Sequence, residues 1–353
     1  MADYDVLGLE EATRWKQELA TLDTKPDIHF TPGYCGLYRN WGEPRLFIYC
    51  DAGTTILYPF ILRRVEPPWD GADYFDEPYY DITSPYGYGG PLAGHSAGTT
   101  DWDRFYWYFA SYCRENNIIT EFIRFHPVLC NHRWLVEHLT VQKVSSVICL
   151  DTTLSDEDIW SGYKRNNRNN IRKASREGIE VVIEPSTAHF QDFIQIYHHT
   201  LDRNDADGFY YFDQDFYTSL HHNLKGNYVY AHALKDGCVV STELLLYNGT
   251  YIHSFLGGTL EEFYQFRPNN LLKHEMICWA KERGIKYFML GGGRREHDGI
   301  FRYKRSFASY GLLNFYIGKK IHDPIAVAKL ECCFAKHKPV QRDDFFPGYR
   351  RYK

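Results

Sequence analysis

The order of predicted elements in the second half of the chain constrains the fold more than any single motif. Apolar residues there recur at helical spacing in some segments and at strand spacing in others. The expected elements are helix 156–177, strand 179–184, helices near 187–202 and 213–224, strands 228–234, 238–247 and 250–257, helix 269–283 and strand 286–290. The first two of the three consecutive strands meet at a Lys-Asp-Gly turn, which is typical of a hairpin. This alternation of helices and strands predicts an α/β fold with a mixed sheet.

The first half of the chain repeats this alternation. The expected elements are helix 9–22, strands 44–50 and 54–64, helix 101–116, strand 118–125, and a further helix and strand to about residue 150. Residues 66–100 are rich in Pro, Gly, Tyr and Asp, which predicts a long loop lined with rings. A last strand and helix are expected to complete the first sheet. Since 353 residues suffice for two cores, we predict one domain from 1–147 plus about 315–353 and a second from 148–314.

Composition narrows the class of protein. A net charge of −5 excludes a general coat for nucleic acid but allows a local basic patch. The 29 tyrosines favour clefts walled by rings. The N-terminus lacks the apolar core of a signal peptide, no apolar run is long enough to span a membrane, and the nine cysteines form no CxxC pair. We therefore expect a soluble, cytoplasmic protein with reduced thiols.

The segment LGGGRREHDGIFRYKRSF (290–307) carries the strongest chemical signal. Lys304 lies there among the rings of Phe301, Tyr303 and Phe307. An ammonium among rings is costly to desolvate unless an anion or a developing oxyanion accompanies it. The alternative is a surface lysine whose stem covers the rings. Read with the rest of the chain, the segment favours an acyl-transfer enzyme.

A second basic feature is YKRNNRNNIRKASREG (163–178). On a helix, Arg165, Arg168 and Arg172 fall on one stripe, Lys164 precedes them, and the neighbouring asparagines add uncharged donors. Such a face suits the phosphates of RNA or of a nucleotide. The alternative is an ordinary solvated helix face.

Two histidines are candidates for proton transfer. His126 follows strand 118–125, two residues after Arg124, so the two side chains would share one face of an extended segment. His253 lies within the predicted strand 250–257. Each imidazole could act as a base or could simply be a packed core residue.

The helix predicted near 269 supplies a candidate anion site. Pro268 stands near its start, Asn269 and Asn270 are expected at the cap, and Arg267 lies beside them. No motif offers metal ligands at the usual spacing, because HEMIC (274–278) ends in Cys278 where HExxH requires histidine. We predict neither a metal nor a cofactor.

Several segments, taken in order, resemble the FemAB family, non-ribosomal aminoacyltransferases with two N-acetyltransferase-like (GNAT) domains. The segments are YGYGGP (86–91), RFHP (124–127), RNNIRKASREGIEV (168–181), PNNLLKHEMICWAKERGIKYFMLGGG (268–293), DGIFRYKRSF (298–307) and FFPGYR (345–350). The resemblance implies two GNAT domains whose mixed, mainly antiparallel sheets are flanked by helices. It also implies transfer of an aminoacyl group from aminoacyl-tRNA to an amine, without a metal.

The resemblance assigns roles to several residues. Lys304 matches the family's channel lysine, which stabilises the carbonyl or its oxyanion, and Tyr303 takes the aromatic place beside it. His126 stands where peptidoglycan-modifying members carry an aspartate, and His253 falls near their channel tyrosine. The rings expected to wall the channel or bind substrate are Tyr86, Tyr88, Phe255 and Tyr303, and Arg124 is also expected to bind substrate.

The sequence departs from the family pattern at the acceptor's phosphates. Arg39 does not clearly match the basic residue that grips the diphosphate, and GFYYFD (208–213) has no cation where one is expected. Each missing charge-assisted hydrogen bond would cost about 1.5–3 kcal/mol. The acceptor is therefore either a cell-envelope precursor or another small amine.

We accordingly predict a monomeric aminoacyltransferase that uses aminoacyl-tRNA, with Lys164, Arg165, Arg168 and Arg172 contacting the tRNA. One alternative is an acyl-CoA-dependent N-acyltransferase, although the glycine-rich cradle for the CoA pyrophosphate is absent near 269. Another is a non-catalytic relative that binds a glycan or a nucleotide.

Overall fold

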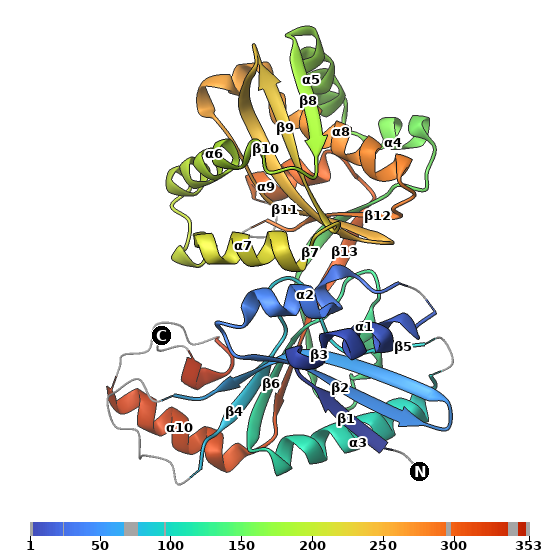
Figure 1. The fold of residues 1–353 in the computed structure, drawn as a ribbon, viewed down its shortest axis with the longest axis vertical. Helices are drawn as coiled ribbons and strands as arrows, with labels where there is room; N and C mark the ends of the chain where they lie inside the picture. Colours follow the sequence, from blue (N-terminus) through green and yellow to red (C-terminus); the bar gives the residue numbers. More distant parts are fainter. Residues whose placement is uncertain are drawn as a thin grey trace. The chain divides into compact units, whose positions relative to one another are not determined.

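The computed structural model describes residues 3–23, 25–66, 77–94, 97–293, 298–337 and 345–350. The chain divides into two compact units (Figure 1). The first comprises Met1–Thr24, His29–Val144 and Phe315–Lys353, and the second comprises Lys25–Ile28 and Ser145–Asn314. Sequence reasoning placed 25–28 in the first domain. Asn248 Nδ2, however, donates to the carbonyl oxygen of Pro26 at 2.7 Å, which ties this short segment to the second unit.

The first unit is built on a mixed sheet in the order β1-β2-β3-β4-β6-β13, with β5 paired to β3. Its strands are β1 (Asp3–Leu7), β2 (Glu43–Asp51), β3 (Thr54–Arg64), β4 (Tyr80–Thr83), β5 (Leu92–Ala93), β6 (Ile118–Arg124) and β13 (Leu312–Ile321). Its helices are α1 (Ala12–Ala20), α2 (Pro32–Cys35), α3 (Thr99–Glu115) and α10 (Pro324–His337). Strands β4 and β6 pair in parallel, whereas β1–β2, β2–β3, β3–β4 and β6–β13 are antiparallel.

Aromatic packing between α3 and the sheet forms the core of the first unit. The buried residues of α3 recur every three or four positions, which gives the helix one apolar face. From that face, Phe109 packs edge-on against Phe47 of β2, with ring centroids 5.2 Å apart, and against Tyr58 of β3 at 4.9 Å. The many tyrosines of the sequence therefore contribute to this core as well as to clefts.

The strands of the second unit are hydrogen-bonded in the order β7-β12-β11-β10-β9-β8. Its strands are β7 (Thr140–Asp151), β8 (Ile179–Glu184), β9 (Tyr228–Lys235), β10 (Cys238–Asn248), β11 (Tyr251–Thr259) and β12 (Tyr287–Gly291). Its helices are α4 (Asp156–Gly162), α5 (Arg165–Arg176), α6 (Phe190–Arg203), α7 (Gln214–Asn223), α8 (Pro268–Glu282) and α9 (Gly299–Arg305). Strands β11 and β12 are parallel, and the neighbouring pairs β12–β7, β10–β11, β9–β10 and β8–β9 are antiparallel.

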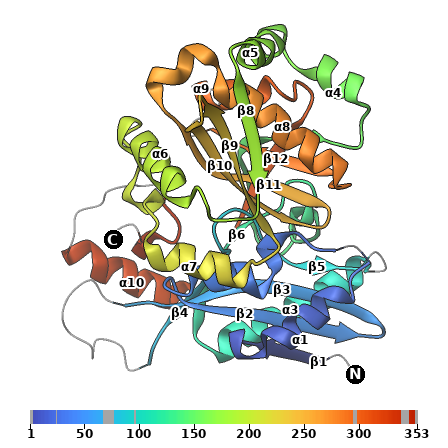
Figure 2. The ribbon, with the colours of Figure 1, turned by 45° about the horizontal axis from the view of Figure 1, so that its top comes forward.

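Helices cover both faces of this second sheet (Figure 2). Val229 of β9 and Leu245 of β10 are directly opposed and share a buried cluster with Met276 and Ile277 of α8. Tyr230, the next residue of β9, points to the other face and packs against Phe193 of α6, with ring centroids 5.0 Å apart. Because side chains alternate along a strand, each position of these strands can be assigned to the α8 face or to the α6 face.

Short 3₁₀ helices connect several of these elements. They are η1 (Leu9–Glu11), η2 (Ile28–Phe30), η3 (Gly36–Tyr38), η4 (Asn131–Trp134), η5 (Gly208–Tyr210), η6 (Glu261–Phe266) and η7 (Gly348–Arg350). Within the ranges that the structure describes, no helix is both long and apolar enough to cross a membrane.

The expected element order is mostly confirmed, with four corrections. The region 66–100 is not one loop, because it contains β4 and β5 as well as the start of α3. The single helix expected over 156–177 is two helices, because Tyr163 between them is extended (ψ 140°). The helix expected between β6 and β7 is absent, and only the short η4 occurs there. Helix α9 was not expected.

Candidate active site in the second unit

The candidate site lies where the parallel strands β11 and β12 stop pairing. Their register covers only Tyr251–His253 against Tyr287–Met289. Beyond this point β11 continues alongside β10, and β12 ends at Gly291, which has a positive φ of 76°. The backbone groups and side chains after this point are therefore available to a site rather than to the β11–β12 ladder.

Lys304 reaches this place from α9. Asp298 caps the helix by accepting a hydrogen bond from the backbone N–H of Phe301 at 2.7 Å, and the side chain of Phe301 is buried. The ammonium of Lys304 donates to the carbonyl oxygen of Gly292 at 2.8 Å. A Cβ on Gly291 would lie 3.3 Å from that ammonium, so the glycine also permits the close approach.

The surroundings of Lys304 disfavour its charged form. The pKa of its ammonium is lowered from the ordinary value to about 8, mainly by loss of hydration and also by repulsion from Lys273, while Glu243 and Asp298 oppose the shift. In the described residues no carboxylate forms an ion pair with Lys304. Its charge is thus only partly compensated, as expected of a group that awaits an anion or a developing oxyanion.

A buried ion pair stands close to Lys304 and was missed by sequence reasoning. The ammonium of Lys273 on α8 lies 2.5 and 2.6 Å from the two carboxylate oxygens of Glu243 on β10, and 2.8 Å from Ser254 Oγ on β11. Burial lowers the pKa of Lys273, and the Glu243 carboxylate opposes that shift. The signal was present in the sequence, because Lys273 occupies the apolar stripe of its helix together with Met276 and Ile277.

Beside Tyr303 lies a pocket of about 350 Å³. Its lining residues are Lys164, Asn166, Asn167, Asn170, Tyr264, Arg267, Asn269, Asn270, Tyr303 and Ser306. The predicted substrate residues Tyr303, Arg267, Asn269 and Asn270 are therefore brought together in one place. The pocket combines two exposed cations, Lys164 and Arg267, with amide groups and a phenol.

Hydrogen bonds hold the polar wall of this pocket in position. Tyr303 donates its hydroxyl to the carbonyl oxygen of Asn269 at 2.8 Å, and Asn270 Nδ2 donates to Asn167 Oδ1 at 2.7 Å. The cap of α8 differs from expectation. Arg267, with φ 60° and ψ 37°, is the N-cap residue, and the two asparagines lie in the first turn of the helix.

The basic helix α5 divides between two environments. Lys164 lines the pocket. Arg168 donates to the carbonyl oxygens of Ser161 at 3.0 Å and Trp160 at 3.4 Å, and the guanidinium of Arg172 lies 5.2 Å from the ring centroid of Trp160. Arg168 thus satisfies the C-terminal carbonyls of α4. Arg165 is exposed.

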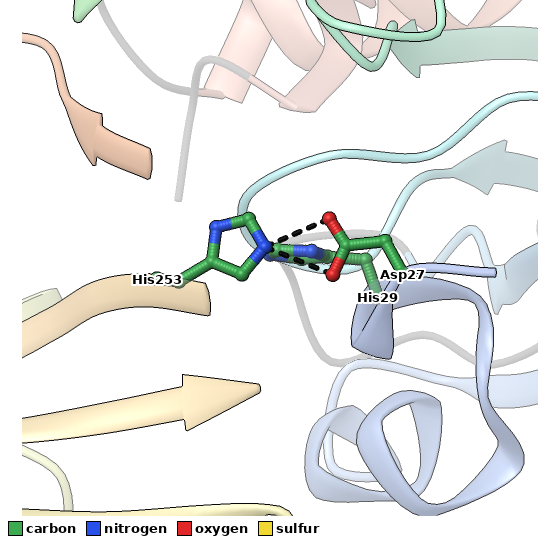
Figure 3. A group of neighbouring side chains, drawn as sticks. All are labelled: Asp27, His29 and His253. Atoms are coloured by element: carbon green, nitrogen blue, oxygen red, sulfur yellow. Dashed lines mark hydrogen bonds and ion pairs between the residues drawn. The ribbon is translucent and has the colours of Figure 1, made fainter. Parts of the chain in front are cut away.

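His253 lies on the other face of the second sheet from Lys273. Ser254, its neighbour, opposes Leu245 on the α8 face, so His253 points to the α6 face. Its Nε2 is 2.7 and 2.8 Å from the two carboxylate oxygens of Asp27, and both side chains are buried (Figure 3). Phe255 stacks on Phe212 at 6.4 Å. His253 therefore does not share the face on which Lys273 and its partners lie.

The other predicted residues belong to the first unit. His126 is fully buried, its Nδ1 accepts the backbone N–H of Leu129 at 3.2 Å, and its ring packs against Tyr88 at 5.4 Å. The backbone oxygen of Tyr86 accepts the hydroxyl of Tyr34 at 2.7 Å. Arg124 ends β6, and its guanidinium lies 4.9 Å from the ring centroid of Phe122.

Comparison with known proteins shows a likeness to one domain family and to several curated proteins. The model of an acetyltransferase (GNAT) domain matches residues 161–305. The Lipid II:glycine glycyltransferases of Staphylococcus haemolyticus (strain JCSC1435) and Staphylococcus aureus are each 25% identical to this chain over 114 residues. The match covers 29% of this chain and 27% of each glycyltransferase, so it spans only about a quarter of their length.

Solved structures extend the likeness over most of the chain. The crystal structure of FemX has a TM-score of 0.70 at 12% identity, covering 93% of this chain and 99% of its own. L-PGS from Bacillus licheniformis has a TM-score of 0.56 at 13% identity, covering 91% and 95%. The expected fold class, GNAT-type with mixed sheets flanked by helices, is confirmed.

Proposed function

Because the chain is FemAB-like and of GNAT-type fold, we propose that it is an aminoacyltransferase. It moves an aminoacyl group from aminoacyl-tRNA to the amine of a cell-envelope precursor, in the cytoplasm and without a metal or cofactor. The observation that carries the proposal is the partly compensated ammonium of Lys304, held at the end of β12 beside a pocket with cationic and amide walls.

The chemistry follows from these groups. The acceptor amine attacks the ester carbonyl of the donor and forms a tetrahedral oxyanion. Lys304, once it turns from the Gly292 carbonyl, donates to that oxyanion, and its charge stabilises the transition state more than the ground state. The ester C–O bond then breaks, the ribose hydroxyl leaves with a proton, and the amine becomes an amide after losing its own proton.

The pocket beside Tyr303 fits the donor's terminal nucleotide. Lys164 and Arg267 supply positive charge for a phosphate, and the asparagines supply donors and acceptors for a ribose or a base. Of the basic residues predicted to contact tRNA, Lys164 is therefore the best placed, whereas Arg168 already binds carbonyls of α4.

The acceptor is inferred from the relatives. The two staphylococcal proteins are described as acting on Lipid II, which favours an amine of a peptidoglycan precursor. His253 lies on the sheet face opposite to Lys273, so we leave it out of the transfer step, and His126, a residue of the first unit, stays a prediction from the sequence.

The decisive test is Lys304→Met, assayed with a panel of charged tRNAs and an amine-bearing precursor. We expect transfer to fall by about 100- to 1,000-fold, since a preorganised oxyanion donor is lost. The matched control is Lys225→Met, because Lys225 is an exposed lysine of the same unit. Thermal unfolding of both variants would establish that the fold is kept. Turnover near that of the unmodified protein in Lys304→Met would refute the role.

An acyl-CoA-dependent N-acyltransferase is the second candidate, because the matching domain model is that of an acetyltransferase. It predicts saturable binding of CoA to the pocket beside Tyr303. Titration calorimetry with CoA, and with a charged tRNA in parallel, separates the two functions by which donor binds.

A further inference from the structure

We propose that Arg124 forms a binding site in the first unit for a small anionic oxygen group, a carboxylate or a phosphate. This site follows from the charges and contacts of the first unit alone, so it is independent of the proposed transferase function.

Arg124 is a cation without an acidic partner. Its guanidinium Nη1 donates one long hydrogen bond, 3.5 Å, to the carbonyl oxygen of Ser84, and it lies over the ring of Phe122. Within the part of the chain that the structure describes, no carboxylate lies within ion-pair distance of it. A guanidinium offers five N–H donors, so most of its hydrogen-bonding capacity is unused.

The neighbouring acid is already shared between two other arginines. Asp81 is fully buried, and its carboxylate accepts from Arg63 Nε at 2.6 Å and from Arg350 Nε at 2.8 Å. Tyr349 donates its hydroxyl to the same carboxylate at 3.1 Å. One negative charge thus faces Arg63 and Arg350, and the charge of Arg124 is additional. The C-terminal motif 345–350, which the proposed transfer step does not use, contributes to this network through Tyr349 and Arg350.

The buried phenol of Tyr38, close to Arg124, cannot supply the missing negative charge. Tyr34, Tyr38 and Tyr86 lie near enough to interact electrostatically with the guanidinium. Burial raises the pKa of Tyr38 far above its ordinary range, so its phenol stays neutral. Loss of hydration, and after it repulsion from Arg63, lower the pKa of Arg124 to about 10. An incoming anion would relieve both costs.

The backbone holds Arg124 in this position. Its N–H donates to Ser84 Oγ at 3.0 Å, and its carbonyl oxygen accepts from the N–H of Gly89 at 2.7 Å. Both Arg124 and Tyr86 retain some exposed surface, so a small anion can reach them. A guanidinium fork binds carboxylate or phosphate oxygens in pairs, which defines the ligand chemistry.

The test is titration calorimetry of the full chain with two probes, inorganic phosphate and N-acetylglycine. We expect saturable binding of at least one probe, and the tighter of the two identifies the anion. In Arg124→Gln the affinity should fall at least about tenfold, because charge-assisted hydrogen bonds are lost. Arg124→Lys keeps the charge but not the guanidinium fork, so its affinity for the probe should lie between those of the unmodified protein and Arg124→Gln.

Arg104→Gln is the matched control, since Arg104 is an exposed arginine of the same unit that pairs with Asp51. It should bind the probe unchanged. Thermal unfolding gives a second, independent readout. Arg124→Gln should be as stable as the unmodified protein or more stable, because an uncompensated cation is removed, and the probe should raise the melting temperature of the unmodified protein only.

Binding of neither probe at millimolar concentration, or equal binding by Arg124→Gln, would overturn the anion site. Loss of transfer in Lys304→Met together with such a result would leave the proposed transferase function standing and remove only the anion site. Probe binding by a protein that shows no transfer activity would support the anion site and contradict the proposed transferase function.

Discussion

The two units treat the end of their parallel strand pair differently. In the first unit, the chain after β4 returns to β6: Ser84 N–H donates to the carbonyl oxygen of Phe122, and Gly89 N–H donates to that of Arg124. In the second unit, the pairing of β11 with β12 stops at His253 and Met289, and side chains from α8 and α9 occupy the place. Beyond the parallel strand pair, backbone hydrogen bonds continue in the first unit, whereas in the second unit polar side chains occupy the corresponding place.

Each unit also has a glutamate that binds partners from a helix, fully buried in the first unit (Glu121) and partly buried in the second (Glu243). Glu121 of β6 accepts from Tyr58 at 2.9 Å, Tyr106 at 3.0 Å and His322 at 3.2 Å, and it is fully buried. Glu243 of β10 binds Lys273 and lies near Lys304. The first glutamate is saturated by partners that join helix and sheet. The second belongs to a group of charges that includes one incompletely compensated ammonium.

The largest effect is expected for Glu121→Ala in the first unit. Three buried donors would lose their acceptor, and unsatisfied buried groups cost about 1–3 kcal/mol each, so the free energy of unfolding should fall by at least about 3 kcal/mol. Denaturant unfolding measures it, with the exposed Glu137→Ala as the control. A change as small as that of the control would show that Glu121 does not hold the first unit together.

The second effect concerns pH and Lys304. Its pKa is lowered to about 8, so the ammonium is present below that pH and is lost above it. The contribution of the cation to transfer should therefore decline by up to about tenfold per pH unit above 8. The Lys304→Arg variant stays charged throughout this range, so the ratio of its transfer rate to that of the unmodified protein should rise with pH. Taking this ratio removes the effect of the acceptor amine's own titration, because that titration is the same for both proteins. If the transfer rate of the unmodified protein instead rises relative to that of Lys304→Arg as the pH approaches 8, Lys304 acts as a base.

A smaller shift is expected when the counter-charge is removed. Glu243→Gln keeps the shape of the side chain but deletes a carboxylate that favours the charged form of Lys304. The basic limb of the transfer profile should move to lower pH by roughly one unit, about 1.4 kcal/mol. The exposed Glu180→Gln serves as the control. If the basic limb of the pH profile does not move, the carboxylate of Glu243 does not influence the pKa of Lys304.

The smallest effect separates two residues of the basic helix. Lys164→Gln should weaken tRNA binding and lower the salt dependence, log K against log [salt], by about 0.7 per lost phosphate contact. Arg168→Gln should leave that slope unchanged and reduce thermal stability, because its guanidinium binds carbonyls of α4. Equal slopes for the two variants would place neither residue on a phosphate.

Local pattern was sufficient to predict much of the fold. Strands 54–64 and 179–184 were expected at the residues where β3 and β8 lie, and the Lys-Asp-Gly hairpin turn is confirmed by the positive φ of Asp236 and Gly237. These features depend on neighbours in the sequence. Helix 156–177 was wrong as one element, because Tyr163 is drawn out of helical geometry by its contacts with His274 and Phe307, both distant in sequence.

The candidate site was only partly predictable. The sequence pointed to Lys304, Tyr303 and the start of α8, because a lysine among rings and a proline before asparagines are local signals. It did not reveal the Lys273–Glu243 pair, which joins residues 30 positions apart, or the separation of His253 from Lys273 by the sheet.

The sequence by itself determined the alternation of helices and strands, the apolar faces that cover each sheet, and the presence of cations in ring-rich segments, since all of these follow from residue type and spacing. Only the tertiary structure decided which cations are neutralised. Lys273 has a carboxylate because β10 brings Glu243 to α8, whereas Lys304 and Arg124 have none among the described residues. Charge compensation depends on groups that strand pairing brings together from distant parts of the chain.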